Sequence, residues 1–141
     1  MRAAVFEAAG QPLVIRDDVE IIAPRAGEVR VRVHYCGLCH SDYSVVSGSF
    51  PFMGPVIVGH EASGVVESVA PGGAAVARWQ PGDEVYGFVG LDATGPYAQY
   101  VVAESTALAR KPPSLSFEEA AAIPVAALTA WKALFDFGGL D

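Results

Sequence analysis

Alternation of hydrophobic and polar positions in the first third of the chain predicts β-strands. Over residues 28–35, three valines stand at every second position between charged or polar side chains. This period of two is typical of a strand with one solvent-facing side. Shorter apolar runs bounded by glycine and proline continue along the chain, and such a series of short strands favours a barrel or a sandwich. The expected strands are 2–6, 13–17, 28–35, 64–69, 84–89, 97–103 and 106–109.

Helical signals are few and mostly late in the chain. Residues 41–47 can form a short helix that ends at Gly48. Ser116 and Glu119 have the spacing of a capping box, in which the hydroxyl and the carboxylate each accept a backbone N–H of the first turn. The sequence therefore predicts a mainly β fold with short helices, and a further helix beginning after Ser116.

Pro124 interrupts this late helix, and a second apolar helix is expected over residues 125–137, with Gly138 as its left-handed cap. The chain thus divides into a β domain, residues 1–124, and a C-terminal helical segment, residues 125–141. If the apolar face of that segment is exposed, it provides a surface through which two copies can form a homodimer. The apolar face comprises Leu128, Trp131, Leu134 and Phe135.

Composition removes several classes of partner. The 141 residues include 9 basic and 16 acidic side chains, so the net charge is −7, and 52% of the residues are hydrophobic. An acidic chain without a basic cluster lacks the charge that nucleic acid or an anionic membrane attracts. The N-terminal apolar run ends at Glu7, too early for a signal peptide. We therefore expect a cytoplasmic protein that binds neither nucleic acid nor membrane.

The two cysteines and the histidine at position 60 are the candidates for chemistry. Cys36 and Cys39 are too few for a disulfide framework, which leaves metal binding, redox chemistry or burial. Cys36 is expected to be a small buried residue, whereas Cys39 lies just before a helix, where backbone N–H groups favour a thiolate. His60, between Gly59 and Glu61, is expected in an exposed turn. A thiolate and an imidazole suit Zn²⁺, although two ligands do not make a site.

Three motifs in order resemble the catalytic domain of the zinc-type alcohol dehydrogenases of the medium-chain dehydrogenase/reductase superfamily. The resemblance implies a GroES-like, partly open β-barrel with short helices and a C-terminal helical segment, followed by a Rossmann domain that binds NAD or NADP. The implied reaction moves hydride between a small alcohol or aldehyde and NAD(P). The motifs are Cys39-His40-Ser41-Asp42, Gly59-His60-Glu61-Ala62-Ser63-Gly64-Val65-Val66 and Pro81-Gly82-Asp83-Glu84-Val85.

The same resemblance implies a metal site. Cys39 and His60 would be ligands of one catalytic zinc, with Glu61 as an adjacent carboxylate that can approach the metal and Asp42 as the carboxylate that orients His60 and can complete the set. Zinc would act as a Lewis acid on the substrate oxygen. The position of the third ligand in the family holds Val125, which cannot bind zinc. Because residues 87–97 contain no cysteine, a structural zinc is not expected.

Three further residues take roles from the resemblance. Ser41 would receive the substrate proton, His40 would contact the cofactor pyrophosphate, and Thr129 would contact the nicotinamide. Ser44 stands where several members have a relay histidine. The second half of the chain resembles the zinc-free quinone and enone reductases of the same superfamily, so a metal-free reduction of a conjugated carbonyl is the alternative. The segments that carry this second likeness are 84–87, 97–102 and 120–124.

A glycine-rich dinucleotide motif, Gly-x-Gly-x-x-Gly, does not occur in the sequence. Such a motif binds the pyrophosphate at a helix N-terminus in Rossmann domains. We therefore expect these 141 residues to be part of a larger oxidoreductase and to be inactive alone. A different class of protein, a stand-alone GroES-like module that binds a partner and catalyses nothing, is the third hypothesis.

Overall fold

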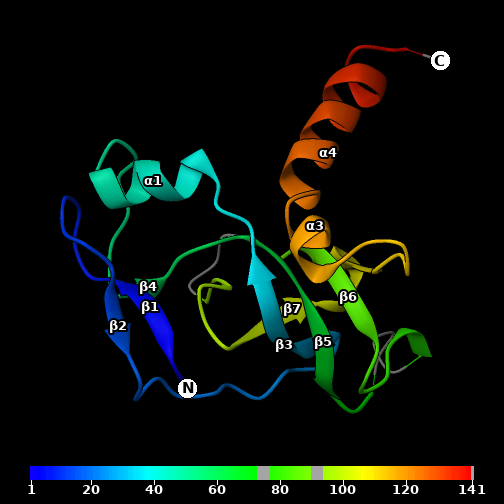
Figure 1. Cartoon of the computed structure of the whole chain (residues 1–141), viewed down its shortest axis with the longest axis horizontal. Coiled ribbons are helices and arrows are strands. Elements are labelled where there is room, and N and C mark those ends of the chain that lie inside the picture. Colours follow the sequence, from blue (N-terminus) through cyan, green and yellow to red (C-terminus); the bar gives the residue numbers. More distant parts are fainter. Residues whose placement is uncertain (73–76, 90–93, 141) are drawn as a thin grey trace.

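The computed structural model describes residues 1–72, 77–89 and 94–140 and contains two antiparallel sheets that do not close (Figure 1). The smaller sheet has the order β2-β1-β4, and the larger has the order β7-β3-β5-β6-β8. This arrangement confirms the predicted mainly β fold. The strands are β1 (Ala3–Phe6), β2 (Val14–Arg16), β3 (Glu28–Cys36), β4 (Val56–Ile57), β5 (Glu61–Val69), β6 (Glu84–Phe88), β7 (Tyr100–Glu104) and β8 (Leu108–Arg110).

The strands differ from the prediction in several places: β7 begins at Tyr100 and not at residue 97, and β4 was not predicted. β4 has two residues, too few to give a periodic signal. The expected strand over 106–109 is a 3-10 helix, η1 (Ser105–Ala107), followed by β8. Strand β5 begins at Glu61, three residues before the predicted start at Gly64, so this glycine lies within the strand. A Cβ there would lie 2.2 Å from the backbone oxygen of Arg32 on β3, so this glycine allows close pairing and does not begin the strand.

The core of the larger sheet explains the valine alternation. Inward-facing valines of β3 pack against β5, β6 and β7, and Trp79 is buried among them with Nε1 donating to the backbone oxygen of Ser105 at 2.9 Å. The two sheets are joined just before β7, where Ala4 N–H donates to the Tyr97 oxygen at 2.8 Å. This link places Tyr97 beside β1. The buried core residues are Val29, Val31, Val66, Trp79, Val85, Val101, Ala103 and Leu108.

Two short helices follow their predicted signals. Helix α1 (His40–Ser47) ends at Gly48, which has φ +83°. Helix α3 (Phe117–Ala121) begins with the expected capping box: Glu119 N–H donates to Ser116 Oγ at 3.2 Å, and Ser116 N–H donates to Glu119 Oε2 at 2.8 Å. Helix α1 carries the first functional motif, and α3 packs against β3 and β5 of the larger sheet.

The C-terminal helix is α4 (Pro124–Trp131), continued by a π-helical turn, η2 (Lys132–Asp136). The prediction of Gly138 as the left-handed cap is wrong, because Gly139 has that conformation, with φ +64°. The wider π turn adds a residue: Phe137 N–H donates to the Lys132 oxygen, five residues back. Gly138 instead lies against the carbonyls of this turn.

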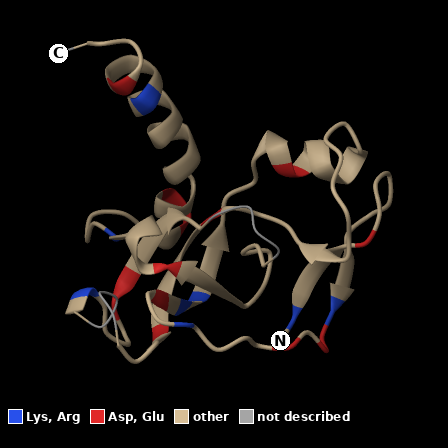
Figure 2. Ribbon diagram, turned by 180° about the vertical axis from the view of Figure 1, so that it is seen from behind, with Lys and Arg blue, Asp and Glu red and all other residues tan. Residues whose placement is uncertain are grey.

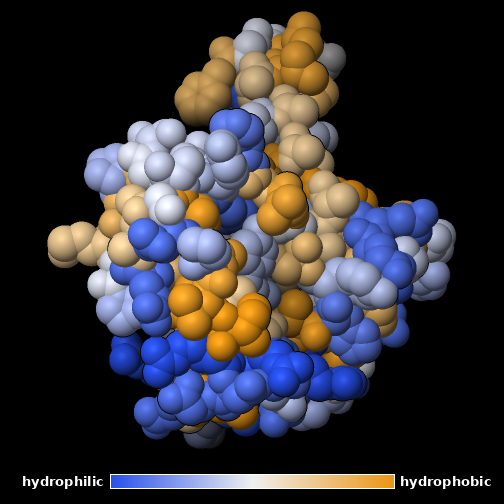
Figure 3. Space-filling model, turned by 60° about the vertical axis from the view of Figure 1, so that its left-hand side comes forward, coloured by the Kyte–Doolittle hydropathy of each residue, from blue (hydrophilic) through white to orange (hydrophobic). Residues whose placement is uncertain are grey.

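Helix α4 contacts β5 and β6 at its base and then extends away from both sheets (Figure 1). Figure 3 shows this helix standing clear of the body, with mainly apolar side chains on its visible face. The large side chains predicted to form one apolar face are all exposed to solvent, from 40% for Phe135 to 59% for Trp131. Within the described ranges, no helix combines the length and apolar character that crossing a membrane requires.

Candidate active site

The carboxylate of Asp42, on α1, accepts four hydrogen bonds from three segments of the chain. Oδ1 accepts from Gly59 N–H and lies 3.1 Å from His60 Nδ1. Oδ2 accepts from Cys39 N–H at 3.2 Å and from the Tyr97 hydroxyl at 3.0 Å. Four donors match the acceptor capacity of a carboxylate. Asp42 therefore links the segments that carry Cys39, His60 and Tyr97.

His60 is 2% exposed and directly precedes β5, so the expectation of an exposed turn is wrong. The turn is buried because Gly59, with φ +94°, lies against Tyr97: a Cβ on Gly59 would be 2.8 Å from Tyr97 Cδ1. The pairing of His60 Nδ1 with Asp42 makes Nδ1 the protonated nitrogen and leaves Nε2 as an acceptor. Among the described residues, no group hydrogen-bonds Nε2. The ring of Phe88 lies 5.6 Å away, centroid to centroid.

Tyr97 and Cys36 remain protonated at neutral pH for the same reasons. Burial, then the charge of Asp42 and the hydrogen bond to it, raises the pKa of Tyr97. The phenol is therefore a donor to Asp42. Burial first, then the carboxylates of Asp42 and Glu61, raises the pKa of Cys36 to about 12. Cys36, at the end of β3, is therefore a half-buried thiol that carries its proton at neutral pH.

The first helical turn of α1 places the other predicted residues. Cys39 is the N-cap, and its Sγ lies 3.6 Å from Ser41 Oγ. His40 is exposed, with Nδ1 3.4 Å from Ser44 Oγ. The Ser44 hydroxyl also donates to the His40 backbone oxygen at 3.1 Å. A hydroxyl thus stands next to the thiol, and a second hydroxyl stands next to the exposed imidazole.

Glu61 is 6% exposed and is tied to the C-terminal helix. Its Oε2 accepts from Val125 N–H, at the first turn of α4, at 3.0 Å. A carboxylate at a helix N-terminus satisfies one of the unpaired N–H groups of the first turn. Glu61 therefore has a structural partner at the position where the resemblance expects the third metal ligand.

The donor set limits what metal these residues can hold. Cys39 Sγ and His60 Nε2 are available as metal ligands. The Asp42 carboxylate already accepts four hydrogen bonds, and Glu61 Oε2 accepts one from a backbone N–H. The side chain of Val125 has no atom that can bind a metal. A catalytic zinc takes three protein ligands. In the described part of the chain, no three His, Cys, Asp or Glu side chains form a group that can hold a metal ion. As arranged here, the residues do not fit the predicted zinc.

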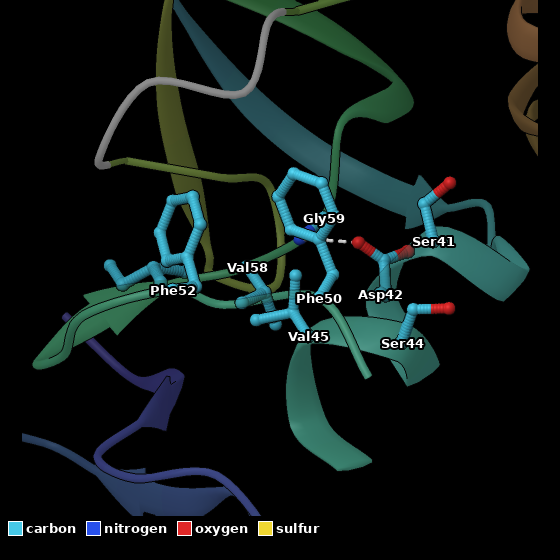
Figure 4. Close-up of a pocket in the computed structure, with 9 residues that line it drawn as sticks. Ser41, Asp42, Ser44, Val45, Phe50, Phe52, Val58 and Gly59 are labelled. Carbon is cyan, nitrogen blue, oxygen red and sulfur yellow. Dashed lines mark hydrogen bonds between the residues drawn. The ribbon is translucent and has the colours of Figure 1, made fainter. Parts of the chain in front are cut away.

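A cavity of about 270 Å³ adjoins Asp42 and is mostly apolar. In Figure 4 the rings of Phe50 and Phe52 lie on one side of the cavity, whereas the hydroxyls of Ser41 and Ser44 point away from these rings. Met53 is 88% exposed and does not line this cavity. The lining residues are Ser41, Asp42, Ser44, Val45, Phe50, Phe52, Ile57, Val58 and Gly59.

The structure thus brings together Cys39, Ser41, Asp42 and His60, and leaves Thr129 exposed on α4. Sequence reasoning missed Tyr97. It lies 55 residues after Asp42, in the segment 97–102 that carries the likeness to the quinone reductases, but no site role was expected for it. The one sequence signal for its position is Gly59, before His60. This glycine has a positive φ, and the Tyr97 ring occupies the space that a side chain there would need.

Comparison with known proteins gives a consistent result. The alcohol dehydrogenase GroES-like domain family matches residues 25–113. An alcohol dehydrogenase of Geobacillus stearothermophilus is 35% identical over 161 aligned positions, covering 95% of this chain and 47% of the relative. Among solved structures, an alcohol dehydrogenase superfamily protein from Novosphingobium aromaticivorans superposes with a TM-score of 0.90 at 29% identity, covering 100% of this chain and 43% of that one.

A quinone oxidoreductase of Pseudomonas syringae pv. Tomato superposes almost as well, with a TM-score of 0.83 at 31% identity, covering 96% of this chain and 41% of that one. Similarity therefore extends to both the alcohol dehydrogenase and the quinone reductase branches. The chain spans less than half the length of these three proteins.

Proposed function

Because the chain belongs to the alcohol dehydrogenase GroES-like domain family, we propose that it supplies the substrate-binding part of a nicotinamide-dependent oxidoreductase. The apolar cavity beside Asp42 would bind a small carbonyl compound or alcohol, and NAD or NADP would exchange a hydride with it. The expected division at residues 124 and 125, and the roles of His40 and Thr129 at the cofactor, remain predictions within this proposal.

The reduction of a conjugated carbonyl without metal has the better support of the two reactions. The observation that carries it is the hydrogen bond from Val125 N–H to Glu61 Oε2, because it occupies a carboxylate that zinc would need. Hydride from the reduced nicotinamide would add to the substrate carbon, the electron pair would move to the carbonyl oxygen, and solvent would supply the proton. Ser41, which lines this cavity, would polarise that oxygen by turning its hydroxyl toward it and donating a hydrogen bond.

Zinc-dependent alcohol oxidation is the second candidate. Its support is the pair Cys39 and His60, with Asp42 fixing the tautomer that leaves Nε2 free to bind a metal. A zinc held by these two residues and a third ligand would supply a Lewis acid for the substrate oxygen. The chain supplies two ligands for it, Cys39 Sγ and His60 Nε2.

Metal dependence separates the two candidates. Enzyme expressed from its complete reading frame is assayed for reduction of cyclohexenone or a quinone by NADH and NADPH, and for oxidation of simple alcohols, with and without a chelator. We expect enone or quinone reduction that survives chelation and less than stoichiometric zinc by metal analysis. Alcohol turnover that the chelator abolishes, with stoichiometric zinc that Cys39→Ala removes, would reverse the assignment.

A matched variant tests the donor argument itself. Val125→Cys restores a sulfur at the position of the third ligand, and Val102→Cys places a sulfur at a half-buried valine of β7, which is not part of the site. We expect Val125→Cys to raise zinc affinity by about tenfold or more, as a third ligand should, and Val102→Cys to leave it unchanged. Equal zinc affinity in wild type and Val125→Cys would show that the missing ligand is not what limits binding.

The homodimer also remains a proposal, and a second copy of this chain is the partner that the C-terminal helix fits. The only charged residues over 124–140 are Lys132 and Asp136, four positions apart. Figure 2 shows this helix mostly tan, with blue and red only toward its outer end. Two antiparallel helices related by a two-fold axis at residue 134 would place each lysine opposite the aspartate of the other copy. The exposed apolar face would lie between them.

The active site, as part of the same proposal, is expected to act on small molecules in the cytoplasm.

A further inference from the structure

Resting on the proposed function, we infer that Tyr97 is a positioning residue of the active site. Its hydroxyl fixes the Asp42 carboxylate, and through it the imidazole of His60. Nothing in the order of motifs assigns a role to this tyrosine, which enters the site from the segment before β7.

Tyr97 contacts the site through its hydroxyl, its ring and its backbone. Its hydroxyl donates to Asp42 Oδ2 at 3.0 Å. Its ring lies close to Gly59, where an added Cβ would be 2.8 Å from Tyr97 Cδ1, and its backbone N–H donates to the Val58 oxygen at 3.1 Å. The tyrosine therefore contacts the turn that carries His60 as well as the carboxylate that the imidazole faces. A residue held at both places limits how these two can move relative to each other.

The division of donors on the carboxylate explains the need for the hydroxyl. Oδ1 serves Gly59 N–H and His60 Nδ1, while Oδ2 serves Cys39 N–H and Tyr97. Without the phenol, Oδ2 retains one donor and the carboxylate can rotate away from the imidazole. Rotation would weaken the preference for a proton on Nδ1, and Nε2 would no longer be held free for substrate or metal.

The test uses Tyr97→Phe in the 141-residue chain, because phenylalanine keeps the ring over Gly59 and removes only the hydroxyl. Two-bond nitrogen–proton NMR spectra report which imidazole nitrogen is protonated, and His34→Gln and His40→Gln spectra assign the remaining signals to His60. We expect one Nδ1–H tautomer in wild type. The ratio of the two tautomers should fall by about tenfold in Tyr97→Phe, the effect of one ordinary hydrogen bond.

Tyr100→Phe is the matched control, since Tyr100 lies three residues later on β7 and does not contact Asp42; it should leave the His60 spectrum unchanged. An unchanged tautomer ratio in folded Tyr97→Phe would overturn the inference. If that variant does not fold, wild type decides: a Tyr97 hydroxyl proton that exchanges freely with solvent would overturn it, and a protected one would support it. Because no readout involves nicotinamide or substrate, failure here is distinguishable from failure of the proposed reaction.

Discussion

Donors from three separate segments converge on Asp42, whereas the large apolar side chains of the C-terminal helix face solvent. In the first region, Asp42 pairs with Gly59, His60 and Tyr97, which lie 17 to 55 residues away along the chain. In the second region, the best-defined side-chain contact lies within the helix itself, between the rings of Trp131 and Phe135, 4.5 Å apart. The same apolar-rich sequence thus contains a site fixed by long-range hydrogen bonds and a helix anchored mainly at its base.

The difference shows where change should be costly. Removing a buried acceptor leaves several donors without partners, and each buried unpaired group costs free energy. Removing an exposed side chain from the helix changes little in the folded chain. Substitutions in the Asp42 region should therefore change the free energy of unfolding, whereas substitutions on the C-terminal helix should change the association between chains.

Asp42→Ala should have the largest effect. It removes the acceptor for Cys39 N–H, Gly59 N–H, His60 and Tyr97 at once, and we expect the free energy of unfolding to fall by about 3–5 kcal/mol. Urea denaturation of the 141-residue chain measures this. Asp136→Ala, on the exposed helix, is the control and should stay within about 0.5 kcal/mol of wild type. Similar losses in both variants would remove the distinction between the two regions.

Gly59→Ala should follow, with a loss of about 2–3 kcal/mol, because it adds a clash to an unfavourable backbone conformation. Gly59 has φ +94°, and the added Cβ would lie 2.8 Å from Tyr97. Gly82 has nearly the same φ, +96°, with nothing within 4 Å of the added Cβ. Gly82→Ala should therefore cost only about 1 kcal/mol. If the two variants lose equal stability, the packing of Tyr97 on this turn contributes nothing.

The sequence predicted those features whose interacting residues lie close together along the chain. Local signals were sufficient for the capping box at Ser116 and for the end of α1 at Gly48, because their partners lie within a few residues. The valine alternation predicted β3 because one face of that strand is buried. The fold class was therefore predictable from patterns of short range, and the family resemblance added the barrel-like topology.

The site needed more than local pattern. Motif order placed Cys39, Asp42 and His60, but the burial of His60 depends on Tyr97, which approaches from the segment before β7. The pairing of Glu61 with Val125 N–H joins positions 64 residues apart, and no periodicity reports such a contact. The π turn in the last helix was also missed, because it changes the hydrogen-bond step without changing the apolar pattern.

Self-association should show the smallest effect and tests the helix directly. If two copies pair antiparallel, Lys132→Asp creates two repulsive contacts with Asp136 of the partner subunit, and sedimentation equilibrium should show association weakened about fivefold, as for two exposed ion pairs. Reversing Asp136→Lys as well should restore wild-type association. Arg25→Asp changes the net charge equally at an exposed position off the helix and controls for general repulsion. A wild-type chain that remains monomeric at high concentration, or a double variant that fails to recover, would contradict the two-fold arrangement, because only reciprocal pairing makes the second reversal compensate for the first.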